Sequence, residues 1–309
     1  MSTVSESLPR ATLTTWFLET RPHFLLLTPA CVLVGAAAAY WDLGRLEPLA
    51  LFLSFVGALL GHVSVNVLND VDDFLVGIDQ RTVPTPFSGG SGFLVRGELS
   101  PQGVRRLGLG ALVLTIPIGA YFLWRVGWGI LPIGVVGAAL VLFYTRHITH
   151  HPLICLVAPG LGFGPVIVLG VSFCQSGSYS PTALAASILP AFLVSDLLLL
   201  NQFPDVEADA YGGRKHIPLK WGLRRAAALY AVLLLAPFLW VAATVGLGLL
   251  PWGALLCWLT MPIAVKAASG VPRSFRERDR LVPLMGTNVM VTLLAPTLMG
   301  IGMILQRLL

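Results

Sequence analysis

Long apolar runs alternate with short polar segments along the chain. Each run is long enough for a helix to cross roughly 30 Å of hydrocarbon. Isolated proline and glycine residues inside the runs do not argue against helices, because packed membrane helices tolerate them. The pattern predicts an all-α, polytopic membrane protein whose nine transmembrane helices occupy residues 23–41, 48–68, 107–124, 128–145, 152–174, 182–200, 226–245, 249–268 and 283–305.

The composition excludes most other classes of protein. Charged residues make up 11% of the chain and hydrophobic residues 56%, with a mean hydropathy of +0.81, whereas a soluble domain carries about 25% charged residues. The four cysteines lie singly inside apolar runs, so neither a zinc site nor a disulfide is indicated. We expect one membrane domain over residues 1–309, with residues 1–22 as an N-terminal segment at the cytoplasmic interface.

The basic residues predict the orientation in the membrane. With the N-terminus on the cytoplasmic side, 17 of the 20 Lys and Arg residues fall in the N-terminal segment or in cytoplasmic loops. The positive-inside rule favours this arrangement, which for a bacterial protein means the cell membrane. Because the charges lie between apolar runs, the net charge of +5 does not indicate a nucleic-acid partner.

Two acidic clusters follow the second and sixth runs, on the same predicted side. Asn69 begins the first, which continues through Asp70, Asp72 and Asp73 to Asp79. Four carboxylates in the bilayer core would cost roughly 10 kcal/mol, so we expect a wet cavity or bound cations. Helical spacing puts four polar residues on one face that should point into the bundle, namely His62, Asn66, Asn69 and Asp73.

The second cluster runs from Asn201 to Asp209 and repeats the Leu-Asn start, with an Asp four residues after the Asn. Pro204 predicts a break, with Asp205 in the first turn of a new short helix. Arg214 and Lys215 follow directly. Two carboxylate clusters beside basic residues suit a magnesium-bridged diphosphate, because Mg²⁺ takes carboxylate and phosphate oxygens together. Ion pairing of the loops at the interface is the alternative.

Other polar positions have simpler interpretations. The loop Ser88–Gly92 either cradles a phosphate through its amides or is a flexible connection. We expect Asp196, inside the sixth run, to be paired within the bundle and to lie outside the site. The cluster His147, His150 and His151 fits a solvated loop better than a metal site, and His216 is expected to cap its loop.

The paired motifs resemble those of the UbiA-type intramembrane prenyltransferases, which carry NDxxDxxxxxD after the second helix and NxxxDxxxD after the sixth. The first motif is most similar to that of the 1,4-dihydroxy-2-naphthoate prenyltransferases. Weaker similarity extends to Arg21-Pro22, Tyr144-Thr145 and the segment Gly160–Pro165. The resemblance implies a nine-helix bundle that transfers a polyprenyl group from its diphosphate to an aromatic acceptor, and it covers most of the chain.

The resemblance also implies roles for individual residues. Magnesium would be held by Asp73, Asp79, Asp205 and Asp209, which together with Asn69 and Asn201 form the candidate catalytic set. Arg81, Arg214 and Lys215 would help the diphosphate leave, and Tyr144 would face the allylic cation. The candidate substrate-binding set is completed by Asn66 and Asp70. The implied partners are a polyprenyl diphosphate, an aromatic acceptor and the lipid bilayer, with the oligomeric state open.

Three alternatives remain at this point. A prenyltransferase of this type could act on another acceptor, such as a chlorophyllide or a phenol. It could also cyclise the same allylic cation. An ion-coupled transporter is the rival from another class, because transporters also place acids on broken helices in repeated halves. Their binding acids lie near the midplane, however, whereas both clusters here are predicted at one membrane face.

Overall fold

A computed structural model describes residues 11–309, and of the expected N-terminal segment residues 1–10 lie outside this part. The described chain is helical and contains no strand. The α-helices are α1 (Leu13–Glu19), α2 (Leu27–Leu43), α3 (Pro48–Leu75), α4 (Pro101–Val126), α5 (Leu131–Phe143), α6 (Pro152–Leu161), α7 (Ile167–Ser176), α8 (Pro181–Asn201), α9 (Val206–Tyr211), α10 (Ile217–Trp221), α11 (Leu223–Gly246), α12 (Met261–Ser274) and α13 (Arg278–Leu308).

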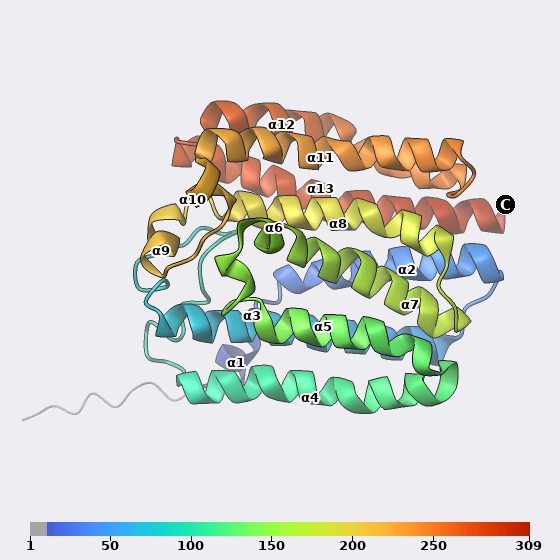
Figure 1. Ribbon diagram of the computed structural model, residues 1–309, viewed down its shortest axis with the longest axis horizontal. Helices are drawn as coiled ribbons and strands as arrows, with labels where there is room; N and C mark the ends of the chain where they lie inside the picture. Colours follow the sequence, from blue (N-terminus) through green and yellow to red (C-terminus); the bar gives the residue numbers. More distant parts are fainter. Residues whose placement is uncertain (1–10) are drawn as a thin grey trace, which may run out of the picture.

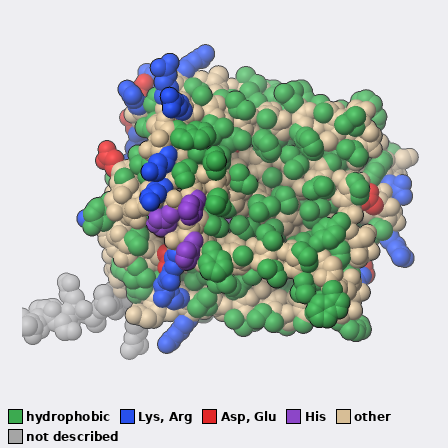
Figure 2. Space-filling model, in the orientation of Figure 1, with side chains coloured by type: hydrophobic (Ala, Val, Ile, Leu, Met, Phe, Trp, Pro, Cys, Tyr) green, Lys and Arg blue, Asp and Glu red, His purple; other side chains and the backbone are tan. Residues whose placement is uncertain are grey.

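Each of the nine predicted runs coincides with a helical segment of the described chain, with ends that differ by a few residues. Eight of these segments are long and apolar enough to cross a membrane, and Trp128–Phe143 is a shorter apolar helix. The long helices lie side by side with their axes roughly parallel (Figure 1). An apolar surface covers the middle of the bundle, and charged side chains gather at its two ends (Figure 2). The chain is therefore a multi-pass integral membrane protein.

Local sequence explains where the helices begin. Glu47, Ser100 and Ser180 cap α3, α4 and α8 with their side chains, and each is followed by a proline at the first helical position. A proline there costs nothing, because the first N–H groups of a helix have no partner within it. These caps set the register of the three helices.

The segment Gly160–Pro165 lies where the span that contains α6 packs closely against α8. A Cβ atom at Gly160 would lie 2.1 Å from the carbonyl oxygen of Ala191, and one at Gly164 would lie 2.5 Å from that of Ser187. Only glycine allows this approach of two backbones. Between the two helices of this span, Gly162–Val166 forms a π-helical turn that turns Phe163 toward the interior of the bundle.

The largest hydrophobic core joins α8, α11 and α13 and contains Leu193, Tyr230 and Met299. This half of the bundle is densely filled and supports the loops at one end. There, the end of α3 and the short helices α9 and α10 lie together, at the end opposite the C-terminus (Figure 1). Both acidic motifs are thus carried by the same end of the molecule.

Candidate functional site

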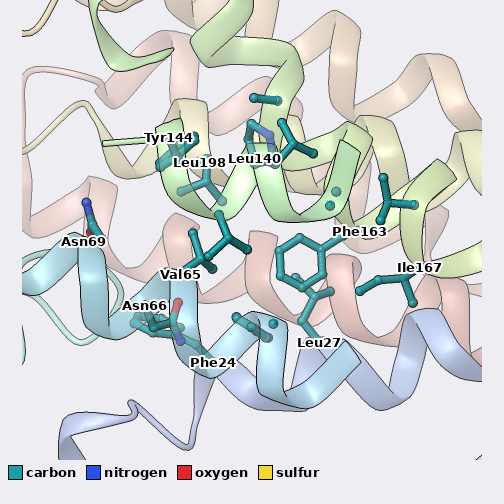
Figure 3. A pocket seen from close by; sticks show the side chains of 18 of the residues that line it. Phe24, Leu27, Val65, Asn66, Asn69, Leu140, Tyr144, Phe163, Ile167 and Leu198 are labelled. Atoms are coloured by element: carbon teal, nitrogen blue, oxygen red, sulfur yellow. The ribbon is translucent and has the colours of Figure 1, made fainter. Parts of the chain in front are cut away.

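A cavity of about 500 Å³ opens among α3, α4, α5, α7 and the acidic loops. Its polar end is lined by Asp73 and Asp79 from the first motif and by Asp205 and Asp209 from the second. The two motifs therefore face one compartment. The rest of the wall is mainly apolar, with Val65, Leu140, Phe163 and Ile167 lying beyond the polar end (Figure 3).

The polar face expected on α3 is present. His62, Asn66, Asn69 and Asp73 all line the cavity. The side-chain amide of Asn69 donates to the Thr145 hydroxyl (3.2 Å), and that of Asn66 lies 3.4 Å from the carbonyl oxygen of Thr20. These contacts hold the two amides at the wall between the acidic end and the apolar part.

The second motif breaks where Pro204 predicts. Helix α8 ends at Asn201, and α9 begins at Val206. The expectation that Asp205 lies in the first turn of α9 is wrong by one residue: Asp205 is its N-cap, and its side chain caps no N–H group. Asn201 and Asp205 each have a buried side-chain oxygen without a hydrogen-bond partner among the described residues.

Arg214 connects the two motifs. Its guanidinium forms ion pairs with Asp73 of the first motif and with Asp209 of the second, the latter at 2.8 Å. The side chains of Asp209 and His216 are hydrogen-bonded at 2.8 Å, and both are buried. The expected capping role of His216 is wrong, because its side chain caps no helix and contacts Asp209 instead.

The other two acids of the polar end, Asp79 and Asp205, have no ion pair of this kind among the described residues. Burial, followed by repulsion from Asp73, raises the pKa of Asp79 to about 7. Burial, followed by repulsion from Asp209, raises the pKa of Asp205 to about 7 as well. A divalent cation would relieve both effects, because it favours the charged form of each carboxylate.

The oxygen donors at the acidic end fit a magnesium ion whose remaining ligands come from water and the substrate. Carboxylate oxygens at Asp79 and Asp205 and the amide oxygen of Asn201 are hard ligands at one end of one cavity. No group of three acidic, His or Cys side chains within residues 11–309 is already spaced for a metal. Mg²⁺ commonly binds through one or two carboxylates plus water and substrate phosphate, so it does not require three such side chains.

Several predicted residues lie elsewhere. Arg81 is exposed and stacks on Tyr211, with its guanidinium carbon 3.4 Å from the ring centre, so it does not line the cavity. Lys215 is exposed and also absent from the wall. Asp70 is buried behind the wall, where it pairs with Arg21 at 2.5 Å and accepts from the Ser91 amide at 2.8 Å.

The loop Ser88–Gly92 is held in place by side-chain contacts, which occupy the backbone amides of Ser88 and Ser91. The Ser91 amide is used by Asp70, and the Ser91 hydroxyl donates to Glu19 at 2.6 Å. Arg21 donates to the carbonyl oxygen of Gly89 at 2.6 Å. Gly90 lies against Asp79, since a Cβ atom there would approach the carboxylate to 2.6 Å. The loop thus packs over the first motif.

Sequence reasoning missed the role of Arg21 in the site. Arg21 lines the cavity and is the one non-glycine residue of the described chain with positive φ, at 55°. A left-handed conformation of this kind is strained, and it marks the turn that brings the N-terminal segment to the site. The weak Arg21-Pro22 similarity was the available signal. Tyr144, in contrast, lines the cavity as expected.

Asp196 also differs from expectation. It is fully buried in α8, but neither of its oxygens has a hydrogen-bond partner among the described residues, so the expected pairing is wrong. It does not line the cavity. Of the three histidines, His147 and His151 are exposed and His150 is partly buried.

Comparisons with known proteins identify the family of the chain. The model of the UbiA prenyltransferase family matches residues 28–288. The chain is 29% identical to a 1,4-dihydroxy-2-naphthoate octaprenyltransferase of Bacillus subtilis, over 87% of this chain and 85% of the relative. It is 25% identical to the protein of the same name from Escherichia coli, over 94% and 96%.

The fold matches solved structures as well. A UbiA homologue from Archaeoglobus fulgidus, solved with DMAPP and Mg²⁺, superposes with a TM-score of 0.64 at 14% identity, over 94% of this chain and 98% of that one. This similarity supports the fold, and the match of the family model over residues 28–288 carries the family assignment.

Proposed function

Because the chain belongs to the UbiA prenyltransferase family and is a membrane prenyltransferase, we propose that it transfers a polyprenyl group from a polyprenyl diphosphate to 1,4-dihydroxy-2-naphthoate and releases diphosphate. The observation that carries the proposal is the single cavity with both acidic motifs at one end and an apolar wall beyond them. Such a cavity matches a substrate with a charged head and a long apolar tail.

The head of the substrate would lie at the acidic end. Asp73, Asp79, Asp205 and Asp209 would hold Mg²⁺, which when bound neutralises the phosphate oxygens and favours departure of the diphosphate. Arg214 lies between Asp73 and Asp209 and presents a planar set of N–H donors to the same space. A guanidinium of this kind stabilises the negative charge that grows on the leaving group.

The reacting carbon would lie next to Asn69 and Tyr144. When the C1–O bond breaks, the allylic carbon becomes positive, and the ring of Tyr144, which lines the cavity, can stabilise it through its π-face. An electron-rich ring carbon of the acceptor then forms the new C–C bond. The ring recovers aromaticity by losing the group on that carbon, which is CO2 at the carboxylate-bearing carbon or a proton, taken up by the released diphosphate, at an unsubstituted one. Asn66 and Asn69 supply amides that orient the hydroxyl groups of the acceptor.

The naphthoate acceptor is supported by the relatives, since those from Bacillus subtilis and Escherichia coli are both named for it. The first motif, ending in Gly77-Ile78-Asp79, resembles that of the 1,4-dihydroxy-2-naphthoate prenyltransferases and points to the same acceptor. We also propose that the acidic end faces the cytoplasm, because most of the basic residues are predicted on that side. A cysteine added after Leu309 should then react with an impermeant maleimide from outside the cell.

The direct test uses purified protein with Mg²⁺, a prenyl diphosphate and one acceptor at a time. We expect diphosphate release and a prenylated product by mass spectrometry with 1,4-dihydroxy-2-naphthoate, at a rate at least tenfold above that with 4-hydroxybenzoate or a chlorophyllide. Preference for another acceptor would overturn the acceptor assignment alone. A cyclic terpene formed without acceptor would show cyclisation, and no diphosphate release would overturn the transferase chemistry.

A further inference from the structure

His62 is a polar side chain in the cavity wall that the proposed chemistry leaves without a role. It lines the cavity on α3 and is 7% exposed. Its Nδ1 is hydrogen-bonded to the Thr28 hydroxyl at 2.8 Å. Its Nε2 has no hydrogen-bond partner among residues 11–309, yet it is not one of the polar atoms that the protein fully encloses. The accessible edge of the imidazole ring therefore faces the cavity.

Other polar side chains in the apolar part of the cavity are satisfied within their own helices. The hydroxyls of Ser54, Thr115 and Thr292 each donate to a backbone carbonyl oxygen three or four residues earlier, at 2.6–2.9 Å. A hydroxyl bonded in this way has used its proton and has little to offer a ligand. The imidazole of His62 differs, because whichever nitrogen carries the proton, Nε2 can either donate to a hydroxyl or accept from one.

The polar face of α3 borders the N-terminal side of the cavity. Asn66 lies four residues after His62 on this face, and its amide contacts the Thr20 carbonyl oxygen, as His62 contacts Thr28. The opposite side of α3 packs on α4, where Ser64 donates to a backbone oxygen of that helix at 2.8 Å. A ligand bound to His62 and Asn66 would therefore lie beside residues 20–28 and away from α4.

Two phenylalanines suit this side of the cavity to a flat ring. Phe24 belongs to the N-terminal segment and Phe163 to the π-helical turn, and both line the cavity together with Asn66 (Figure 3). Phe163 meets the imidazole of His62 edge to face, with ring centres 4.6 Å apart. Aromatic rings pack favourably against one another in such arrangements. An aromatic acceptor fits here and leaves the apolar wall of α4 and α5 to the prenyl tail.

The spacing of Asn66 and His62 matches a ring with two para hydroxyl groups. Side chains four residues apart on a helix have Cβ atoms about 5–6 Å apart, which is close to the separation of the two oxygens across one 1,4-dihydroxy ring. A carboxylate on that ring would stay toward the polar end of the cavity, because a charge buried among apolar side chains is unfavourable. The hydroxyl next to the carboxylate would then lie near Asn66, and the other near His62.

We propose that His62 selects a para-dihydroxy aromatic acceptor by binding its second hydroxyl through Nε2, while Asn66 and Asn69 hold the hydroxyl nearer the acidic end. The inference rests on the proposed function and adds the residue that distinguishes a 1,4-dihydroxy ring from a monohydroxy ring. A ring without the second hydroxyl would cover Nε2 and leave it unpaired. A buried polar group without a partner weakens binding, so such a ring is disfavoured.

Equilibrium binding tests the proposal without turnover. The protein is loaded with Mg²⁺ and a non-hydrolysable prenyl diphosphate analogue, and calorimetry without oxygen gives the Kd of 1,4-dihydroxy-2-naphthoate and of 1-hydroxy-2-naphthoate, which lacks the second hydroxyl. Wild type should bind the monohydroxy compound at least tenfold more weakly. His62→Leu and His62→Phe should each reduce this ratio to about twofold or less, because they weaken binding of the dihydroxy compound alone.

Thr115→Val is the matched control, since it removes a polar group from the α4 wall of the same cavity and should leave the ratio unchanged. Both His62 variants should fold, because the Thr28 hydroxyl can then donate to a carbonyl oxygen of its own helix. An unchanged ratio in either folded variant, or a wild-type ratio below about threefold, would overturn the role of His62. Absence of a prenylated product from 1,4-dihydroxy-2-naphthoate with wild type is a different result, which contradicts the proposed function itself.

Discussion

Asp73, in the last turn of α3, forms an ion pair with Arg214, 141 positions later in the chain. The same guanidinium binds Asp209 at 2.8 Å. Arg214 therefore joins the two acidic motifs at one end of the cavity. The arrangement makes the motifs one site, and each of its members can be tested separately.

Replacement of a proposed magnesium ligand should stop the reaction. We expect Asp73→Asn and Asp205→Asn to release diphosphate at less than a tenth of the wild-type rate, because a lost ligand removes several kcal/mol of transition-state stabilisation. Asp72→Asn is the control within the same motif. Asp72 pairs with Arg146 at 2.9 Å and does not line the cavity, so this variant should stay within about threefold of wild type.

Removal of divalent metal should have the same effect as loss of a ligand. We expect EDTA to abolish diphosphate release and Mg²⁺ to restore it, because the proposed site joins substrate and carboxylates through the ion. Mg²⁺ with a non-hydrolysable prenyl diphosphate analogue should also raise the melting temperature of the wild type. Asp205→Asn should show a clearly smaller rise, and an equal rise would place the ion elsewhere.

Replacement of Arg214 should reduce activity and stability far more than replacement of Arg81, a difference that the structure indicates and the sequence does not. Arg214→Ala leaves Asp73 and Asp209 buried without their partner, so we expect a marked loss of melting temperature together with at least a hundredfold loss of activity. Arg214→Lys should recover part of the stability, but not the planar contact with two carboxylates.

Arg81→Ala should retain most of the activity, because Arg81 stacks on Tyr211 outside the cavity. An exposed stack of this kind contributes about 0.5–1 kcal/mol. The rate of diphosphate release checks this. If Arg81→Ala loses as much activity as Arg214→Ala, Arg81 contacts the diphosphate during turnover, as the sequence motif predicts.

The sequence predicted the features that depend on residues close together in the chain. Apolar length located the nine helical segments, Pro204 located the break after α8, and helical spacing placed His62 and Asp73 on one face. Each of these follows from residues within a few turns of one another. Position along a single helix is enough to determine them.

The positions of loop side chains depend on contacts between distant segments, which the spacing of residues along the sequence does not reveal. Arg81 and Arg214 both follow an acidic motif, yet one stacks on Tyr211 and the other enters the cavity. The first motif packs beside the end of α9: a Cβ atom at Gly212 would lie 2.3 Å from Ile78, and the preceding Tyr211 lies against Arg81. A contact between segments so far apart cannot be read from either one alone.

Glu19 should make stability depend on pH. Burial, followed by repulsion from Asp70, raises its pKa from 4.5 to about 7. Between these values the unfolded chain loses the proton while the folded protein keeps it, so stability falls as pH rises, by at most about 3 kcal/mol at pH 8. Glu19→Gln should therefore melt like wild type at pH 4.5 and higher than wild type at pH 8. Glu277→Gln, at an exposed glutamate, controls for surface charge. Parallel melting curves for wild type and Glu19→Gln across this range would show that Glu19 is charged throughout.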